Sequence, residues 1–396
     1  MPSKYDHRDR CANIGIGSTE FSKYSGRSDL SLATEAALVA CADAGITADQ
    51  IDGIVRCDRD LVRHTDLIES LGLPDLAYWG EVGPGGTAPC AMIGQAVGAI
   101  LSGQATTVLA FRALNGRSGV RYGMADWKTG SGRVGGGGTY DEFFLPFGLM
   151  TPGQIFALMA QRHMQCYGTS EEDLGHIALA CRGRANANPA AQMYGRDLTM
   201  DDYLNARMIS SPLRLFDFCL ETDGACAVLV TSTERAQDHR QPPVLIRAVA
   251  QGSLPNPQPG VQFPVLMRED ITTLPARAVA DRLYARAGMG PAEIDVAQLY
   301  DCFTITVLLQ LEDFGFCPKG EGGDFAASGA LDLGGSLPIN TSGGHLSEGY
   351  IHGMNHIVEG VRQMRGQSTS QVDGAEVCLV ASTPLPPGSA LVLRRA

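Results

Sequence analysis

Two tyrosines stand in segments whose residue types are typical of a chemical site. Tyr300 follows the apolar run 294–299, which predicts a buried strand, so Tyr300 lies at a strand end, where ligand sites usually form. Tyr350 lies in the polar, glycine-dense loop 340–353, which leads into a helical pattern. Glycines let backbone amides approach a ligand, and a helix N-terminus favours negative charge. We therefore predict a site that stabilises developing negative charge; the alternative is a tight loop that happens to contain Tyr350 and His352.

Composition limits the class of protein. The chain has 396 residues, 44% of them hydrophobic, and a formal net charge of −12. This charge, without any basic block, argues against nucleic acid or an anionic membrane as the main partner. The N-terminus lacks an apolar leader and no apolar run of about 18 residues occurs, so we expect a cytoplasmic protein. The 11 cysteines form no CxxC pair, and we expect reduced, buried thiols and no metal.

A strand, a helix and a second strand open the chain. The strand is expected at 14–16, the helix at 30–45 with Asp29 as its N-cap, and the second strand from residue 51. Gly45 is well placed to end the helix. In the same half, the segment 91–103 consists of small apolar residues on all sides, which predicts a helix buried between sheets.

The opening unit recurs 243 positions later. Six identities stand in register: Ala33, Ala37, Ala44, Gly45, Ile51 and Asp52 match Ala276, Ala280, Ala287, Gly288, Ile294 and Asp295. We interpret the chain as a duplicated α/β half, with the second central helix ending at Gly366. The predicted domains are residues 1–238 and 239–396, with an insertion at about 115–215 in the first.

The insertion has a helical pattern of its own. Helices are expected at 151–167 and 171–186, and Gly135–Gly138 is interpreted as a mobile loop. Asp223 is interpreted as a turn residue before an apolar strand. Four apolar residues either line a wall for a polycyclic substrate or belong to the core of the insertion: Phe143, Phe144, Phe147 and Met150.

The motifs together resemble those of the sterol-carrier-protein-type thiolases over almost the whole chain. The resemblance rests on Tyr300–Phe303, on Asn340 with Gly343 and Gly344, on Gly349–Gly353, on Arg184–Pro189 and on Asp223–Ala225. It implies an α/β thiolase fold of duplicated, five-layer αβαβα halves with an inserted loop region.

Departures from the thiolase pattern change the expected chemistry. The catalytic cysteine of thiolases falls on Gly86, and Cys90 lies one turn further along, about 6 Å deeper by helix rise. Cys90 is therefore expected to pack as a small hydrophobe. The histidines of the family's His-Asp-Cys-Phe and Gly-His-Pro motifs are here Tyr300 and Tyr350. Claisen chemistry has lost its thiolate and both imidazoles.

A thiolase-shaped pocket without a nucleophile can still stabilise a thioester enolate, which is also the product of retro-aldol cleavage. In these features the chain resembles bacterial steroid side-chain aldolases. The resemblance implies a β-hydroxyacyl-CoA substrate of cholesterol or bile-acid type, and Tyr300 and Tyr350 as the acid/base pair in either order. It also implies a homodimer core in which each subunit binds a small zinc-ribbon/OB-fold acyl-CoA-associated protein, giving a heterotetramer, with no cofactor.

Several other residues are candidates for supporting roles. Gly86, Asn340, Gly344 and His352 are expected to support the site or its oxyanion hole, and Asp301 could orient the tyrosines. For His345, His352 and His356 a structural role is an equal alternative. The four lysines lie outside apolar strands, which disfavours a Schiff base, and no histidine cluster in the sequence indicates a metal.

Two rival functions remain open at this point. The first is an acyltransferase or thiolase that uses Cys90 or Cys378 as nucleophile. The second is a non-catalytic carrier of acyl-CoA or sterol. The steroid, and whether acetyl-CoA or propionyl-CoA leaves, are not specified by any motif.

Overall fold

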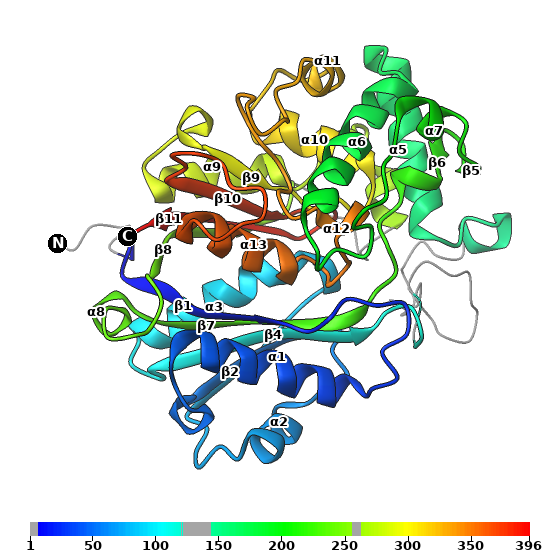
Figure 1. The fold of residues 1–396 in the computed structure, drawn as a ribbon. Coiled ribbons are helices and arrows are strands. Elements are labelled where there is room, and N and C mark those ends of the chain that lie inside the picture. Colours follow the sequence, from blue (N-terminus) through cyan, green and yellow to red (C-terminus); the bar gives the residue numbers. More distant parts are fainter. Residues whose placement is uncertain (1–6, 120, 122–143, 256–262) are drawn as a thin grey trace.

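A nine-stranded mixed sheet forms the centre of the protein. The computed structural model describes residues 7–119, 121, 144–255 and 263–396 (Figure 1). Within them the strand order is β3-β2-β4-β7-β1-β8-β11-β10-β9. These strands are β1 (Cys11–Ser18), β2 (Gly53–Cys57), β3 (Tyr78–Val82), β4 (Thr107–Asn115), β7 (Asp223–Ser232), β8 (Val244–Gly252), β9 (Val296–Gln298), β10 (Val377–Ser382) and β11 (Gly388–Arg395).

The sheet is folded into two layers with helices between and outside them. Strands β1 and β8 join the layers through only two residue pairs, Ala12 with Leu245 and Asn13 with Val244. Helix α3 contacts both β2 and β8, and α13 contacts both β7 and β10, so both lie between the layers (Figure 1). Helices α1 and α9 cover the outer faces. These helices are α1 (Asp29–Ala44), α3 (Pro89–Leu101), α9 (Ala276–Ala287) and α13 (Met354–Arg365). The predicted α/β thiolase-type layering is confirmed.

The duplication is visible in matching local structure. Gly45 and Gly288 end α1 and α9 in the same left-handed conformation, with φ of 75° and 72°. Short 3-10 helices follow at Ala48–Gln50 and Pro291–Glu293. Each repeat then uses an aspartate in the same way. Asp52 accepts N–H groups at the start of β4, and Asp295 accepts N–H groups at the start of β10. The division into domains at residue 238 remains a prediction, because both halves share one sheet.

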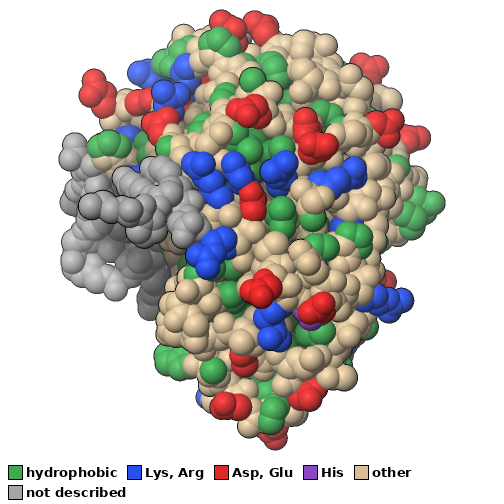
Figure 2. Space-filling model, turned by 90° about the vertical axis from the view of Figure 1, so that its left-hand side faces the viewer, with side chains coloured by type: hydrophobic (Ala, Val, Ile, Leu, Met, Phe, Trp, Pro, Cys, Tyr) green, Lys and Arg blue, Asp and Glu red, His purple; other side chains and the backbone are tan. Residues whose placement is uncertain are grey.

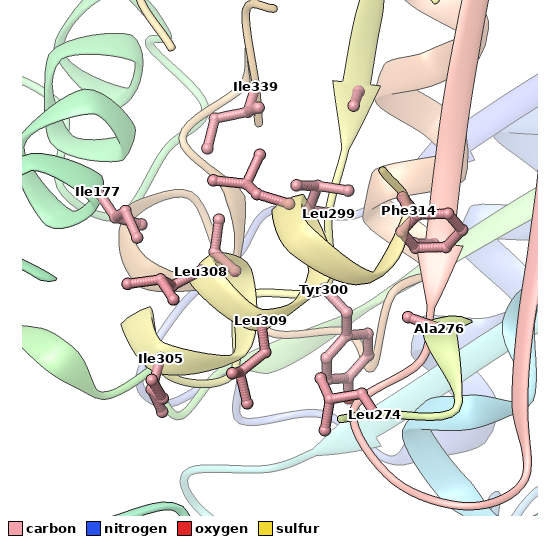
Figure 3. Packing of buried hydrophobic residues seen from close by; sticks show 14 of the residues in the cluster. Ile177, Leu274, Ala276, Leu299, Tyr300, Ile305, Leu308, Leu309, Phe314 and Ile339 are labelled. Atoms are coloured by element: carbon pink, nitrogen blue, oxygen red, sulfur yellow. The ribbon is translucent and has the colours of Figure 1, made fainter. Parts of the chain in front are cut away.

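The insertion packs on the second half. Its helices are α5 (Pro152–Tyr167), α6 (Glu171–Ala187) and α7 (Met200–Leu204), and it carries the hairpin β5 (Met208–Ser210) and β6 (Leu213–Arg214). Helix α6 contacts α10, α11 and α12, and Ile177 of α6 packs towards Leu308 of α10 in one apolar cluster (Figure 3). The remaining helices are α2 (His64–Leu71), α8 (Thr233–Ala236), α10 (Thr304–Asp313), α11 (Gly322–Ala327) and α12 (Gly344–Ser347). The two helices predicted in the insertion are confirmed.

Three local predictions differ from the structure. Ser28, not Asp29, caps α1, because the Ser28 side chain accepts the N–H of Ser31. Asp223 is not a turn residue: it begins β7 and is buried, and its carboxylate accepts N–H groups from Ser25, Arg117 and Ser118. Helix α3 begins two residues earlier than expected. The predicted loop Gly135–Gly138 lies outside the described residues.

The distribution of surface charge and the hydropathy of the helices are relevant to the predicted partners and location. On the face in Figure 2, acidic and basic side chains are interspersed, although several Lys and Arg side chains form a band across its middle. None of the helices in the described ranges is long and apolar enough to cross a membrane. The cytoplasmic location itself stays a prediction.

Candidate active site

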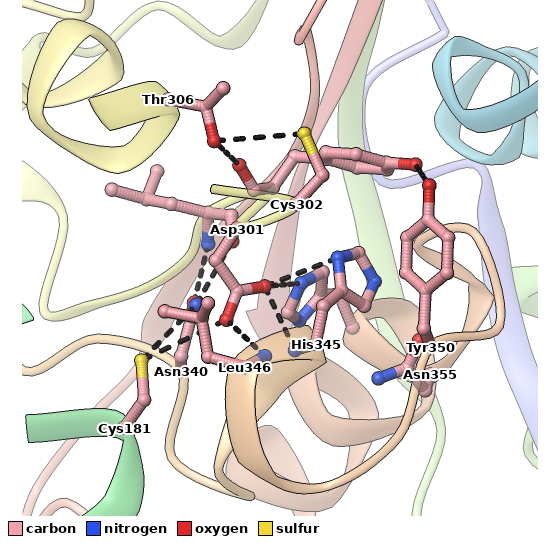
Figure 4. A network of polar contacts seen from close by, with 12 residues as sticks. Cys181, Asp301, Cys302, Thr306, Asn340, His345, Leu346, Tyr350 and Asn355 are labelled. Atoms are coloured by element: carbon pink, nitrogen blue, oxygen red, sulfur yellow. Dashed lines mark hydrogen bonds and ion pairs between the residues drawn. The ribbon is translucent and has the colours of Figure 1, made fainter. Parts of the chain in front are cut away.

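The two candidate tyrosines meet in the structure. Tyr300 lies just beyond β9 and is buried, and its backbone oxygen accepts hydrogen bonds from Gln310 Nε2 (2.7 Å) and Thr306 Oγ1 (2.9 Å) of α10. Tyr350 is held from another side, since its backbone N–H donates to Thr222 Oγ1 at 2.8 Å. The two hydroxyl oxygens are 2.8 Å apart and form a hydrogen bond (Figure 4). The fold therefore joins the phenols into one proton-carrying unit.

The hydroxyl group of Tyr300 fits beside Tyr350 because residue 86 is a glycine and has no side chain. Gly86 lies in the 3-10 helix Gly85–Thr87, directly before α3. A Cβ atom at residue 86 would lie 1.8 Å from the Tyr300 hydroxyl oxygen and 2.6 Å from its Cζ. A side chain there would exclude the tyrosine from its present position. The place that the thiolase resemblance assigns to the nucleophile is thus filled by the phenol of Tyr300.

Asp301 places a buried negative charge behind the tyrosines. Its Oδ1 accepts the backbone N–H of His345 (2.9 Å) and Nε2 of His356 (2.9 Å), and its Oδ2 accepts the N–H of Leu346 (3.1 Å) (Figure 4). Burial raises the pKa of this carboxyl group, but the charge of His345 and the hydrogen bond from His356 outweigh burial and lower the pKa to about 2. Asp301 is therefore ionised at neutral pH.

Two histidines pack against the tyrosine rings. The ring centre of His345 is 4.7 Å from that of Tyr300 and 4.8 Å from that of Tyr350, in edge-on geometry. The ring of His352 is 4.8 Å from that of Tyr350. Burial is the main cause that lowers the pKa of both histidines well below the ordinary value. The part of these histidines in catalysis remains a prediction.

Asn340 and Gly344 shape the loop behind the tyrosines. Both have positive φ angles, 45° and 60°. Asn340 Oδ1 accepts the N–H of Leu299 (2.7 Å), and its Nδ2 donates to the oxygen of Leu299 (3.0 Å). A Cβ atom on Gly344 would lie 2.2 Å from Asp301 Oδ2. Neither residue lines the cavity in front of the tyrosines. Their predicted role in an oxyanion hole is therefore still a prediction.

The fold brings two of the histidines around this loop together with Asp301. Asp301, His345 and His356 each offer a metal-ligating atom, and these atoms lie within 4.8 Å of one another. Their spacing in the sequence did not indicate this grouping as a metal site. Both oxygens of Asp301 already accept N–H groups, which is the geometry of a hydrogen-bond network. The expected absence of a metal stays a prediction.

A cavity of about 850 Å³ is lined by both tyrosines, together with Gly86 and His352. Most of the remaining wall is apolar, and the insertion supplies much of it. The apolar residues include Phe156, Phe216, Phe218, Phe303, Leu346 and Leu385. An apolar cavity with a few convergent polar groups is typical of a small-molecule site.

The aromatic wall differs from the residues that the sequence suggested. Phe147 is 86% exposed, and Phe144 packs against the core. Neither these residues nor Met150 line the cavity, and Phe143 lies outside the described residues. Of the two alternatives, the core interpretation is confirmed for Phe144, and none of the three described residues forms the wall. Phe156 sits on the inward face of α5, a position that the helical pattern contains but does not mark as part of a site.

Sequence reasoning also missed a buried cation. Arg112 of β4 is fully buried, its Nε lies 3.0 Å from Asp60 Oδ1, and its Nη1 donates to the backbone oxygen of Gly85 at 3.4 Å. Burial raises the pKa of Tyr300, whereas the hydrogen bond with Tyr350 and the charge of Arg112 act to lower it. A single arginine inside the apolar run 108–114 was the available signal.

Comparison with known proteins agrees with this geometry. A family model described as thiolase C-terminal domain-like matches residues 262–391. The chain is 43% identical over 385 residues, 97% of this chain and 99% of the relative, to the 17-hydroxy-3-oxo-4-pregnene-20-carboxyl-CoA lyase of Mycobacterium tuberculosis. It is 44% identical over 383 residues, 96% and 97% of the two chains, to a steroid side-chain-cleaving aldolase of Thermomonospora curvata. The chain belongs to the family of thiolase-like steroid side-chain-cleaving aldolases.

Solved structures agree on the fold. A structure titled Ltp2-ChsH2(DUF35) aldolase matches with a TM-score of 0.91 and 43% identity over 98% of each chain. Human mitochondrial 3-ketoacyl-CoA thiolase matches with a TM-score of 0.69 over 98% and 99% of the two chains. At 13% identity that likeness shows the fold alone. The resemblance to thiolases and to steroid side-chain aldolases is confirmed.

Four cysteines of this family member, Cys90, Cys219, Cys302 and Cys378, are poor nucleophiles. Cys90 and Cys378 are fully buried, and burial raises the pKa of the Cys90 thiol to about 12. The Sγ atom of Cys90 lies 3.4 Å from Ser382 Oγ inside the core, which confirms that it packs as a small hydrophobe. Cys219 and Cys302, which sequence reasoning did not single out, do line the cavity. Burial raises the pKa of both thiols, so neither is a thiolate at neutral pH.

Replacing Gly86 with alanine should displace the Tyr300 hydroxyl group and lower kcat/KM about 100-fold, because a misplacement of about 1 Å can cost that much. The variant should also lose about 1 to 3 kcal/mol of stability through overpacking. Gly98→Ala in α3 is the matched control, since a Cβ atom there meets nothing within 4 Å. Steady-state kinetics and urea denaturation measure both effects. Full activity of the Gly86 variant would contradict the close contact.

The variant Asp301→Asn should be about 2 to 3 kcal/mol less stable than the wild type at pH 7, because hydrogen bonds to a charged acceptor are strong. The folded-state pKa of about 2 lies below the ordinary 3.8, so the carboxylate stabilises the fold above about pH 4 and this contribution is lost as the pH falls towards 2. The difference between wild type and variant should shrink over that interval in urea titrations. A difference independent of pH would refute the assignment.

Proposed function

We propose that this chain is an aldolase, a carbon–carbon lyase that cleaves the β-hydroxyacyl-CoA side chain of a steroid by a retro-aldol reaction. The products would be a steroid ketone or aldehyde and a short acyl-CoA. The observation that carries the proposal is the hydrogen-bonded pair of Tyr300 and Tyr350 in a largely apolar cavity, with glycine at the thiolase nucleophile position. The names of the relatives at 43% and 44% identity support the same reaction class.

The tyrosine pair can move the single proton that this reaction requires. As one phenol oxygen accepts the proton of the β-hydroxyl group, it passes its own proton along the 2.8 Å hydrogen bond to the other phenol. The Cα–Cβ electron pair becomes the thioester enolate and the carbonyl forms at Cβ. The second phenol gives its original proton to Cα in the same relay, so both phenols are neutral before and after the reaction. No electron is gained or lost overall, so the step needs no oxidant or reductant.

Burial raises the pKa of both tyrosines. The charge of the buried Arg112 acts to lower the pKa of Tyr300 and is not among the causes for Tyr350. We therefore propose Tyr300 as the phenol that accepts the substrate proton and Tyr350 as the phenol that protonates Cα. The enolate would be stabilised by the N-terminal end of α3 beside Gly86, where the helix dipole favours negative charge.

The rival functions have weaker support. Acyl transfer requires a thiolate, and the thiols that line the cavity have raised pKa values. A carrier of acyl-CoA or sterol needs the cavity but gives no reason for two phenols in hydrogen-bond contact. We retain the carrier as the alternative that the variants below exclude or support.

We also propose that the chain works with partners. The solved relative whose title names a DUF35 component suggests a small zinc-ribbon/OB-fold protein as a heterologous subunit. A homodimer core is proposed as well, giving a heterotetramer. Strand β3 is an outer edge strand of the sheet, and its residue Trp79 is 66% exposed. A second copy of the chain could pair with this edge strand. No cofactor is proposed beyond the CoA thioester of the substrate.

The function is tested by incubating the chain, co-expressed with its small partner, with a β-hydroxyacyl-CoA steroid and detecting products by mass spectrometry. Wild type should release the ketone or aldehyde and a short acyl-CoA. Tyr300→Phe and Tyr350→Phe should each lower kcat at least 100-fold, within the range of about 10² to 10⁴ that general acid–base groups contribute. Cys90→Ala should retain activity. An acyl adduct on a cysteine, without carbon–carbon cleavage, would return the protein to the acyltransferases.

The dependence of kcat on pH distinguishes a mechanism in which both phenols are protonated at rest from one that needs a resting tyrosinate. Because burial raises both tyrosine pKa values above the ordinary 10, both phenols stay protonated through the neutral range. kcat should therefore be nearly constant from about pH 7 to 9 and fall only above about pH 10. A mechanism that needs a resting tyrosinate predicts instead a tenfold rise in kcat per pH unit over the same range. Stopped-flow or discontinuous assays in overlapping buffers distinguish the two.

A further inference from the structure

Four basic side chains line the cavity, and two of them, Arg182 and Arg196, are neighbours. Lys23, Arg59 and Arg196 line the cavity and are exposed, and Arg182 lines it while being only 6% exposed. The one carboxylate among the described lining residues is Glu221, which already pairs with two arginines, Arg117 and Arg121. The protein has a net charge of −12, so this group of cations is not a consequence of overall composition.

Arg182 is the fixed member of this group. On α6 its Nε donates to Ser347 Oγ at 3.0 Å, and its Nη1 donates to the backbone oxygen of Arg196 at 3.4 Å. The guanidinium carbon lies 5.5 Å from the ring centre of Phe216, which supports it from one side. Ser347 is the last residue of α12, three positions before Tyr350, so this hydrogen bond links the guanidinium group to the segment that carries Tyr350.

The partners of Arg182 are neutral. Burial and then the charge of Arg196 lower the pKa of Arg182, and no carboxylate in the described ranges forms an ion pair with it. A buried cation is costly unless an opposite charge compensates it. Two neighbouring arginines with no acidic partner on a cavity wall indicate an anionic ligand. Arginine presents several N–H donors in a planar fork that matches a phosphate group.

We infer that Arg182 and Arg196 form the binding site for a phosphate group of the CoA part of the substrate. The inference rests on the proposed function, because it names how that substrate is held. A CoA thioester has its phosphates at one end and, in the proposed substrate, an apolar steroid at the other, with the thioester between. The cavity wall contains groups suited to each of these parts: cations, the tyrosine pair and aromatic side chains.

Binding without turnover tests the site directly. Isothermal titration with CoA on the full chain, co-purified with its partner, compares wild type with Arg182→Gln and Arg196→Gln. Each variant should bind CoA about 10-fold more weakly or worse, as expected for losing one charge-assisted contact of about 1.5 to 3 kcal/mol. The matched control is Arg162→Gln on α5, an exposed arginine outside the cavity, which should leave CoA affinity unchanged.

Two truncated ligands identify the phosphate. Pantetheine lacks every phosphate ester of CoA and should bind the wild type and both variants equally. If the substitutions weaken the binding of dephospho-CoA, the arginines hold the diphosphate. If the wild type already binds dephospho-CoA weakly and the variants bind it no more weakly, the arginines hold the 3′-phosphate. Unchanged CoA affinity in both variants, or an equal loss for pantetheine, would overturn the inference. Arg196 is exposed, so its variant remains informative if Arg182→Gln fails to fold.

Failure of this inference and failure of the proposed function can be told apart. If the arginine variants lose CoA affinity but wild type cleaves no steroid thioester, the phosphate site stands and the aldolase assignment falls. If wild type cleaves the thioester and both variants keep its KM, the aldolase assignment stands and the phosphate site falls. A loss in kcat alone at unchanged KM would also count against the site, because phosphate binding remote from the reacting bond should appear mainly in KM.

Discussion

The hydroxyl group of Tyr300 occupies the volume that any side chain at residue 86 would need, and the site depends on this steric exclusion. With a Cβ atom only 1.8 Å from the phenol oxygen, residue 86 must be glycine while residue 300 is tyrosine. A thiolase-type cysteine and this tyrosine therefore cannot coexist in the same backbone. The absence of the thiolase cysteine and the presence of this tyrosine are therefore one coupled exchange at two positions, because the two side chains would need the same volume.

The tyrosine pair needs a rigid support, and Asp301 provides it. Its carboxylate accepts hydrogen bonds from two backbone N–H groups of α12 and from a histidine ring nitrogen of α13. Asp301 therefore connects the segment after β9 to α12 and to α13. A buried charge is costly, and here several donors satisfy it. His345, held by this charge, lies edge-on to both tyrosine rings. The polar network behind the phenols thus fixes the geometry in front of them.

The insertion supplies several of the side chains that line the cavity. The thiolase-type halves supply Tyr300, Tyr350 and Gly86, whereas Phe156 and Arg182 come from helices of the insertion. The insertion, which lies outside the duplicated core, therefore contributes both apolar and basic side chains to the cavity wall.

Sequence by itself determined most of the elements and the candidate reacting groups. The repeat from Ala33 to Asp52, the two tyrosines in place of histidines and the empty nucleophile position could all be read from residue types and spacing, because helix ends, burial patterns and motifs depend on neighbours a few residues apart. The structure confirmed the duplicated α/β fold and the burial of Cys90 on those grounds.

Only the tertiary structure decided which groups meet. The contact of Gly86 with Tyr300, the charge of Arg112 beneath Gly85, and the cluster of Asp301 with His345 and His356 join segments far apart in the chain. No local pattern specifies such contacts, since they arise from how whole layers pack. For the same reason Asp223, which resembles a turn residue in sequence, became a buried acceptor for two distant loops, and the aromatic wall came from Phe156 and not from Phe147.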